Sequence, residues 1–263
     1  MASLTGKSPA QFYKDLPHIS NSNTGIDATT RRIFDGAGNT ISILLSDDVL
    51  GVQPANDDTT GTFYVKKNNG STVFNVDTTN SLVKTGAEQV NATTQYKYFS
   101  SMGLVPLAGS HMVLFGNPSG HYGTTVSEEE LGSGTDPATT KDMSTGNDAA
   151  YWTAFLWYLP DAITLDAVHV FMAVNSATSG DLNYHLMSYD IDIGNGATSG
   201  DLSGGVVLAD GSAITGVDRL AIDYQALTIQ SSDVDSRKVI LATVESTSTF
   251  PVSVNMSVKY HIR

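Results

Sequence analysis

The side chains that could catalyse a reaction or bind a metal are scattered along this sequence of 263 residues. None of its six histidines lies in a His-Glu-x-x-His or comparable metal-binding spacing. They are His18, His111, His121, His169, His185 and His261. The chain has no cysteine, which excludes thiol nucleophiles, disulfides and cysteine-bound zinc. It also has no Gly-x-Ser-x-Gly elbow and no P-loop. The sequence therefore predicts no catalytic residue, no cofactor, no metal site and no enzymatic activity.

One short stretch, at Asp190, Asp192 and Asn195, places oxygen-bearing side chains close together. Hard oxygens at alternate positions are typical of a calcium loop, but the distal bidentate glutamate of such a loop is missing. We interpret the stretch as the tip of a hairpin and leave open whether it binds an ion. A polysaccharide-cleaving site would need two carboxylates facing each other across a groove. The 27 acidic residues offer no identifiable pair.

The densest aromatic cluster, Tyr-Trp-Thr-Ala-Phe-Leu-Trp-Tyr-Leu at 151–159, holds both tryptophans. Flat rings could form a sugar-binding platform, or they could belong to the core and a subunit interface. Apolar residues fall on both faces of this run, and also on both faces of the strand expected at 163–174, which favours the second interpretation. The residues assigned to the core or a subunit interface are Trp152, Phe155, Trp157, Tyr158 and Phe171.

Charge and composition exclude two classes of partner. The formal net charge is −13, and no basic patch occurs, so neither nucleic acid nor an anionic membrane surface is an expected partner. No segment has the length or hydrophobicity of a signal peptide or a membrane span, so we expect neither secretion nor membrane insertion. Charged residues make up only 16% of the chain, and small polar residues replace them, which suits a β-rich protein with many turns.

Strict alternation of apolar and polar residues predicts strands through the last 160 residues. The clearest run is 250–262, in which every second residue from Phe250 to Ile262 is apolar. Further strands are expected at 112–115, 151–159, 163–174, 182–193, 205–208, 224–229 and 238–245. Short helices are expected only at 8–16 and 127–131. This pattern predicts an antiparallel, jelly-roll-like β-sandwich head.

The first hundred residues differ, because turn-forming sequences separate short strands there. A hairpin is expected with strands at 62–66 and 72–76 around an Asn-Gly turn, whose residues tolerate positive φ. These strands carry too few large apolar residues to form a core in one chain. We therefore expect three copies of the chain to associate around an axis as a homotrimer.

Residues 24–54 resemble the N-terminal region of tail-fibre and related virion proteins of marine tailed phages. The resemblance extends over roughly the first third of the chain. The matching motifs are Lys-Ser-Pro at 7–9, Asn-Ser-Asn at 21–23, Gly-Ile-Asp at 25–27 and Asp-Gly-Ala-Gly at 35–38, the last leading into a serine-containing apolar strand. The resemblance implies a trimeric virion protein anchored by its N-terminus. It assigns virion anchoring to Lys7, Pro9, Gly25, Ile26, Asp27, Asp35, Gly36 and Gly38.

The sequence thus predicts an all-β chain in three parts: an extended virion-anchoring arm at 1–60, a β-hairpin stem and linker at 61–102, and a β-sandwich head at 103–263. The expected function is that of a trimeric tail-fibre or spike-like appendage, assembled in the host cytoplasm and located in the virion. Its partners would be other virion proteins of the tail, neck or capsid, and a glycan or protein of the host surface. The alternative is a capsid decoration or head-fibre protein that clamps the shell.

Overall fold

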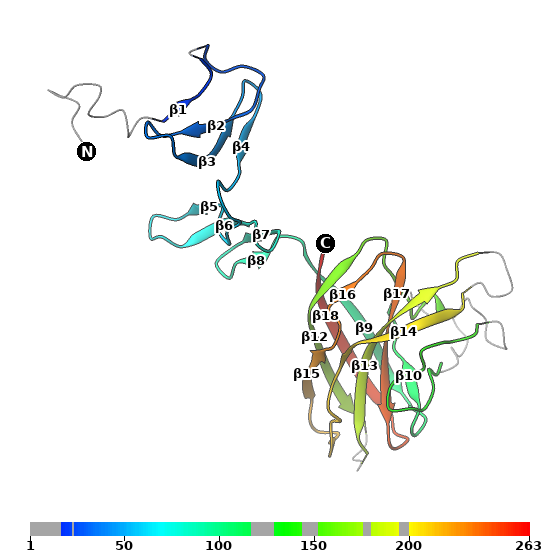
Figure 1. Cartoon of the computed structure of the whole chain (residues 1–263). Coiled ribbons are helices and arrows are strands. Elements are labelled where there is room, and N and C mark those ends of the chain that lie inside the picture. Colours follow the sequence, from blue (N-terminus) through cyan, green and yellow to red (C-terminus); the bar gives the residue numbers. More distant parts are fainter. Residues whose placement is uncertain (1–16, 23, 117–128, 144–151, 176–179, 195–199) are drawn as a thin grey trace. The chain divides into compact units, whose positions relative to one another are not determined.

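The computed structural model describes residues 17–22, 24–116, 129–143, 152–175, 180–194 and 200–263. Every named element in these residues is a β-strand (Figure 1), which confirms the all-β prediction. The chain forms two compact units, Met1–Thr93 and Thr94–Arg263. Within the described segments, no helix is long and apolar enough to cross a membrane.

The first unit contains two small antiparallel sheets, each a simple meander. The strands of the first sheet are β1 (His18–Ile19), β2 (Arg31–Phe34), β3 (Thr40–Leu45) and β4 (Leu50–Val52). Those of the second are β5 (Phe63–Lys66), β6 (Thr72–Asp77), β7 (Leu82–Thr85) and β8 (Val90–Asn91). The expected hairpin is therefore present as β5 and β6, with Phe63 paired to Val76. Gly70 takes a φ of 87° in its turn, which a glycine adopts without strain.

The described part of the first unit has no hydrophobic core of its own. Among residues 17–22 and 24–93, only Ser46 and Asp77 are buried, and neither is apolar. Large apolar side chains are exposed on both sheets, among them Ile43, Leu50, Phe63 and Val65. Turn hydrogen bonds, strand pairing and the Asp77–Lys84 ion pair (2.8 Å) hold these sheets together.

The second unit is the head. Its longer strands are β9 (Thr94–Leu104), β12 (Ile163–Val174), β13 (Leu182–Ile191), β14 (Leu202–Asp210), β15 (Asp223–Ile229), β17 (Lys238–Ser246) and β18 (Val252–Ile262). Its short strands are β10 (His111–Val113), β11 (Trp157–Tyr158) and β16 (Asp233–Val234). They follow one another in the order β10-β17-β13-β14-β15-β12-β18-β9, with β11 beside β17 and β16 beside β12.

The strands of the head are wound as a jelly roll. Its first strand pairs with its last (β9 with β18) and β10 pairs with β17. Nested inside them, β12 pairs with β15, and the central hairpin is β13 with β14. This winding produces two facing sheets, β15-β12-β18-β9 and β10-β17-β13-β14, with Greek-key connections. The predicted antiparallel sandwich is confirmed.

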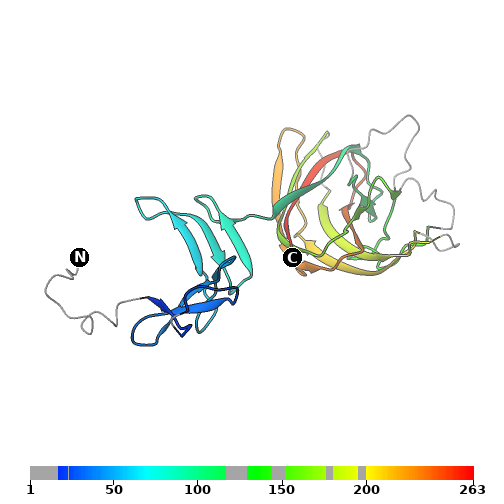
Figure 2. The ribbon, with the colours of Figure 1, turned by 90° about the horizontal axis from the view of Figure 1, so that it is seen from above.

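The core lies between the two sheets. It contains Val168, Val170 and Met172 of β12, Leu186 of β13, Ile240 of β17 and Met256 of β18, all almost completely buried. The inward residues of β18 are the alternating apolar residues that the sequence singled out. The two ends of the strand order also meet: Ser100 of β9 and Phe115, just after β10, exchange two backbone hydrogen bonds of 2.8 and 3.0 Å. Seen from above, the head curls around its core (Figure 2).

The structure corrects several sequence-based expectations. The compact head begins at Thr94 rather than at 103, because 94–104 forms β9 and pairs along β18. Residues 17–52 form a paired sheet rather than an extended arm. Of the described residues in the strand expected at 151–159, only Trp157 and Tyr158 are in a strand, and residues 152–156 form a tight turn. Residues 129–131 pair with β10 instead of forming a helix. Residues 127–128 and the helix expected at 8–16 lie outside the described residues.

Candidate functional site

The outer surface of the sheet β15-β12-β18-β9 is a broad face that no described part of the head covers. Register places outward side chains in rows across it, for example Tyr224, Phe171, Asn255 and Ser100. We call this surface the open face. Between the Ala167 and Ala173 rows, its outward residues include Tyr224 and Ala226 on β15, Ala167, His169, Phe171 and Ala173 on β12, Ser253, Asn255, Ser257 and Lys259 on β18, and Tyr96, Tyr98, Ser100 and Met102 on β9.

Three rings on one side of the open face hold each other in position. The Phe171 and Tyr224 ring centroids lie 5.1 Å apart, and those of His169 and Tyr224 lie 5.8 Å apart in a stacked arrangement. The Tyr224 hydroxyl is also hydrogen-bonded to Nδ1 of His169 at 2.8 Å. Phe171 nevertheless remains 51% exposed. These contacts give the side chains a fixed geometry before any partner arrives.

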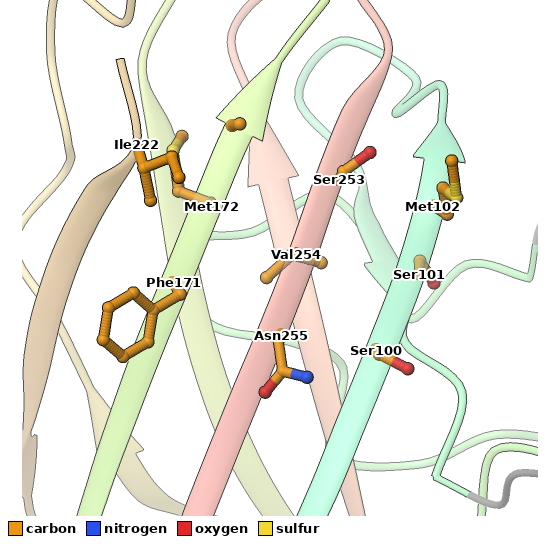
Figure 3. A pocket seen from close by; sticks show the side chains of 10 residues that line it. Ser100, Ser101, Met102, Phe171, Met172, Ile222, Ser253, Val254 and Asn255 are labelled. Atoms are coloured by element: carbon orange, nitrogen blue, oxygen red, sulfur yellow. The ribbon is translucent and has the colours of Figure 1, made fainter.

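A shallow groove of about 350 Å³ crosses one end of the open face. Its floor holds small polar side chains, Ser253 and Asn255 of β18 and Ser100 of β9, as Figure 3 shows. Phe171 and Ile222 border it on one side and Met102 borders it on the other. The Met102 side chain is 95% exposed and that of Ile222 is 76% exposed. We call the floor residues the hollow, and Phe171, Tyr224 and Ile222 the ridge.

The open face is nearly free of charge. The rows from Ala167 to Ala173 carry no outward aspartate or glutamate, although the chain has 27 of them, and Lys259 is the only outward lysine or arginine in those rows. At the end of the face opposite the groove, Asp166 of β12 accepts a hydrogen bond from His261 of β18 at 3.0 Å. This part of the face therefore offers shape and apolar contact.

The outer surface of the opposite sheet, β10-β17-β13-β14, is covered by the chain itself. Residues 129–143 and 152–156 pack over it and bury a second apolar cluster that includes Leu131, Trp152, Phe155 and Leu241. Trp152 is only 1% exposed. Backbone hydrogen bonds attach this cover to β14, from Gly205 N to the Thr139 carbonyl (2.9 Å) and between Lys141 and Leu202. One outer face of the sandwich is therefore closed, and the other is open.

A pair of histidines is buried beneath this cover. The His111 and His185 rings meet edge to face with centroids 5.0 Å apart, and both side chains are at most 2% exposed. His111 Nε2 lies 2.9 Å from the Gly134 carbonyl, and His185 Nε2 lies 3.6 Å from Asp136. Burial and the neighbouring His111 lower the pKa of His185, although Asp136 and Asp210 oppose that shift. The Nδ1 atoms of both rings have no hydrogen-bond partner among the described residues.

Of the five residues that the sequence assigned to a core or interface, three pack in the apolar clusters of the head and two are exposed. Trp152 and Phe155 belong to the covered cluster, and Trp157 packs against the main core beside Tyr260. Tyr158 and Phe171 are exposed. The aromatic run at 151–159 therefore does not form a sugar platform within the described residues. The exposed aromatic surface lies instead around Phe171. The sequence did not single out Tyr96, Tyr98 and Tyr224, which belong to the same surface. The apolar residues on both faces of 163–174 did indicate an outward face that needs cover.

The described residues with the virion-protein motifs lie in the first sheet and its turns. Asp27 accepts hydrogen bonds from the Arg31 guanidinium and from Asn21 Nδ2 (3.1 Å), and these contacts hold the pKa of its carboxyl well below its usual range. Asp35 closes the Asp-Gly-Ala-Gly turn by accepting from the backbone N–H groups of Ala37 and Asn39 at 2.9 and 2.8 Å. Ile26 is exposed. Lys7 and Pro9 lie outside the described residues.

The structure describes only part of the possible ion-binding stretch. Asp190 is in β13, and its carboxylate accepts a hydrogen bond from Lys238 at 2.8 Å. Asn195 lies outside the described residues. No group of three or more candidate metal ligands occurs among the residues that the structure describes.

Comparison with known proteins leaves the chain without a family assignment. No family model matches the sequence. No curated protein matches it either. Among solved structures, the chain is similar to one reported as the structure of infectious bursal disease virus Gx strain, with 10% identity and a TM-score of 0.25. That match covers 72% of this chain and 64% of the other, less than two thirds of its length. At this TM-score the likeness carries no argument about function.

Proposed function

We propose that this chain is a structural protein of a virus particle, a homotrimeric tail-fibre or spike-like appendage. Its first unit attaches to the particle and its head faces outward. The contrast between the two units carries this proposal. The head buries a complete core, whereas the described part of the first unit buries no apolar side chain. Small sheets with exposed apolar surface gain stability when they pack against copies of themselves or against a partner.

The chemistry of the chain supports a structural role rather than a catalytic one. The open face has aromatic and small polar side chains without paired carboxylates, and the buried histidines lie beneath a cover of their own chain. The jelly roll supplies a rigid scaffold, and viral capsid proteins are one of the classes that use this architecture. Because fold alone does not decide function, the motifs resembling phage virion proteins at 24–54 carry the assignment to a tailed-phage particle.

Assembly onto particles tests the assigned polarity. Deletion of residues 1–60 is expected to abolish incorporation, while the head remains folded and soluble. Mass spectrometry of purified particles measures incorporation, and circular dichroism of the truncated protein measures folding. Incorporation of the truncated chain, together with loss of incorporation when the head is removed, would show that the polarity is reversed. Absence of the full chain from particles would refute the virion role itself.

A further inference from the structure

We infer that the open face is an interface between heads, buried against further copies of this chain in a closed three-fold ring. The ridge of each head (Phe171, Tyr224 and Ile222) occupies the hollow of the next (Ser100, Ser253 and Asn255). This inference builds on the proposed homotrimer and assigns its contact surface in the head. It does not depend on where the protein sits in a particle.

Charge is the first argument that the occupant is a second copy. Each chain carries a formal net charge of −13, so copies repel one another at most orientations. Between the Ala167 and Ala173 rows the open face has no outward carboxylate and Lys259 is its single lysine or arginine, while Asp166 lies at the end opposite the hollow. Two such faces can meet without bringing like charges together. A strongly basic partner would find no acidic group among the residues that line the groove.

Composition is the second argument. The buried centres of protein interfaces are rich in aromatic residues and methionine and poor in charged residues. The open face carries Phe171, Tyr96, Tyr98, Tyr224 and Met102, each more than half exposed in the single chain. Ile222 and Leu220, at the same end as Met102, are 76% and 86% exposed. Aliphatic side chains exposed to this extent gain most by contact with apolar protein, and a sugar would leave them largely wet.

Shape is the third argument. The ridge and the hollow lie side by side on the same face, on different strands, so the face contains both halves of a complementary contact. The rings of the ridge are already held by the Tyr224–His169 hydrogen bond, so little conformational freedom is lost when they dock. A ridge-to-hollow contact is heterologous, and such contacts must close into a ring to give a discrete assembly. A ring of three heads satisfies this requirement in a trimer.

Cysteine labelling tests whether the face is buried, because the natural chain has no cysteine. Ser100→Cys places a single thiol in the hollow, and Ser203→Cys places a matched thiol on an exposed position of β14. In the full-length chain, maleimide should label Ser100→Cys at least about ten-fold more slowly than Ser203→Cys while the protein is assembled. Dilution into the monomer range should remove the difference. Sedimentation velocity on the same samples should give three times 27.8 kDa before dilution.

A charge variant makes the test specific. Asn255→Asp is nearly isosteric, lies at an exposed position and puts one carboxylate into each hollow. It should restore fast labelling of Ser100→Cys, whereas Ser203→Asp should leave labelling slow. If the full chain sediments as a trimer but both thiols react equally fast, the trimer is held elsewhere and this inference is wrong. A monomer at micromolar concentration would overturn the inference and the proposed trimer together, and would leave the virion role to the particle experiment.

Discussion

The buried side chain of His185 makes the stability of the head depend on pH. Its folded pKa is lowered, chiefly by burial and also by His111, so below about pH 6.5 the unfolded chain binds a proton that the folded chain resists. The resulting stabilisation is therefore present above that pH and is lost as the pH falls through the folded pKa. Glu129 acts in the opposite sense, because burial raises its pKa.

Comparison of variants isolates the contribution of His185. We expect the wild-type chain to lose more unfolding free energy than His185→Gln when the pH is lowered from 8 to 5. Urea denaturation at each pH, followed by intrinsic fluorescence, measures the difference. Equal losses in the two proteins would show that His185 does not titrate differently in the folded and unfolded states.

Two buried tyrosines with different hydrogen bonding make a second test at the scale of single residues. The Tyr189 hydroxyl donates to the Ala138 carbonyl at 2.7 Å, whereas the Tyr184 hydroxyl is buried without a hydrogen-bond partner in the described structure. Tyr189→Phe should therefore cost about 1 kcal/mol or more, because a buried carbonyl loses its donor. Tyr184→Phe should leave the stability unchanged or raise it. Thermal unfolding of both variants checks the contrast, and an equal loss in both would contradict it.

Among the elements, the cover over β10-β17-β13-β14 depends on a close approach at Gly205. A Cβ at this position would lie 2.6 Å from Tyr189 Cε1 and 2.7 Å from the Cα of Thr139. Gly205→Ala should therefore push residues 138–141 away from β14 and cost about 1–3 kcal/mol. Urea denaturation gives the cost, and amide exchange at 138–141 gives its location. Ser203→Ala, at an exposed neighbouring position, is the control, and a similar cost for both would argue against the steric explanation.

The strands that could be predicted from the sequence are those in which one period dominates. The runs at 163–174 and 250–262 correspond to β12 and β18. The Asn-Gly turn sequence correctly predicted the hairpin of β5 and β6. The strand β9 was missed because Tyr96, Tyr98 and Met102 are apolar but face outward, which obscures the usual alternation. The turn at 152–156 was mistaken for a strand because its apolar residues pack on both sides in a covered layer. The open face arises from pairing between β9, β18, β12 and β15, which are distant in sequence, so no local pattern could reveal it.

For the whole molecule, the two units should differ in how their stability depends on protein concentration. The head has a core within one chain, whereas the described part of the first unit does not bury any apolar side chain. If copies supply the missing cover, dilution should increase amide exchange in 63–91 while β12, β13, β17 and β18 stay protected. Hydrogen exchange with mass spectrometry at two concentrations measures this. Concentration-independent protection of 63–91 would mean that these sheets are stable in a single chain.

Ser100 and Phe115 join the two ends of the strand order, and this pairing affects how heads behave when many are held close together. An unpaired strand edge is a template on which another chain can add, and this is a common route to aggregation. In the head, β9 and β10 are linked through that pair, and Glu129, Leu131 and Gly132 form backbone hydrogen bonds with β10. Many heads can therefore be held at high local density with few edges on which strands could stack, so association is directed to side-chain surfaces rather than to backbone.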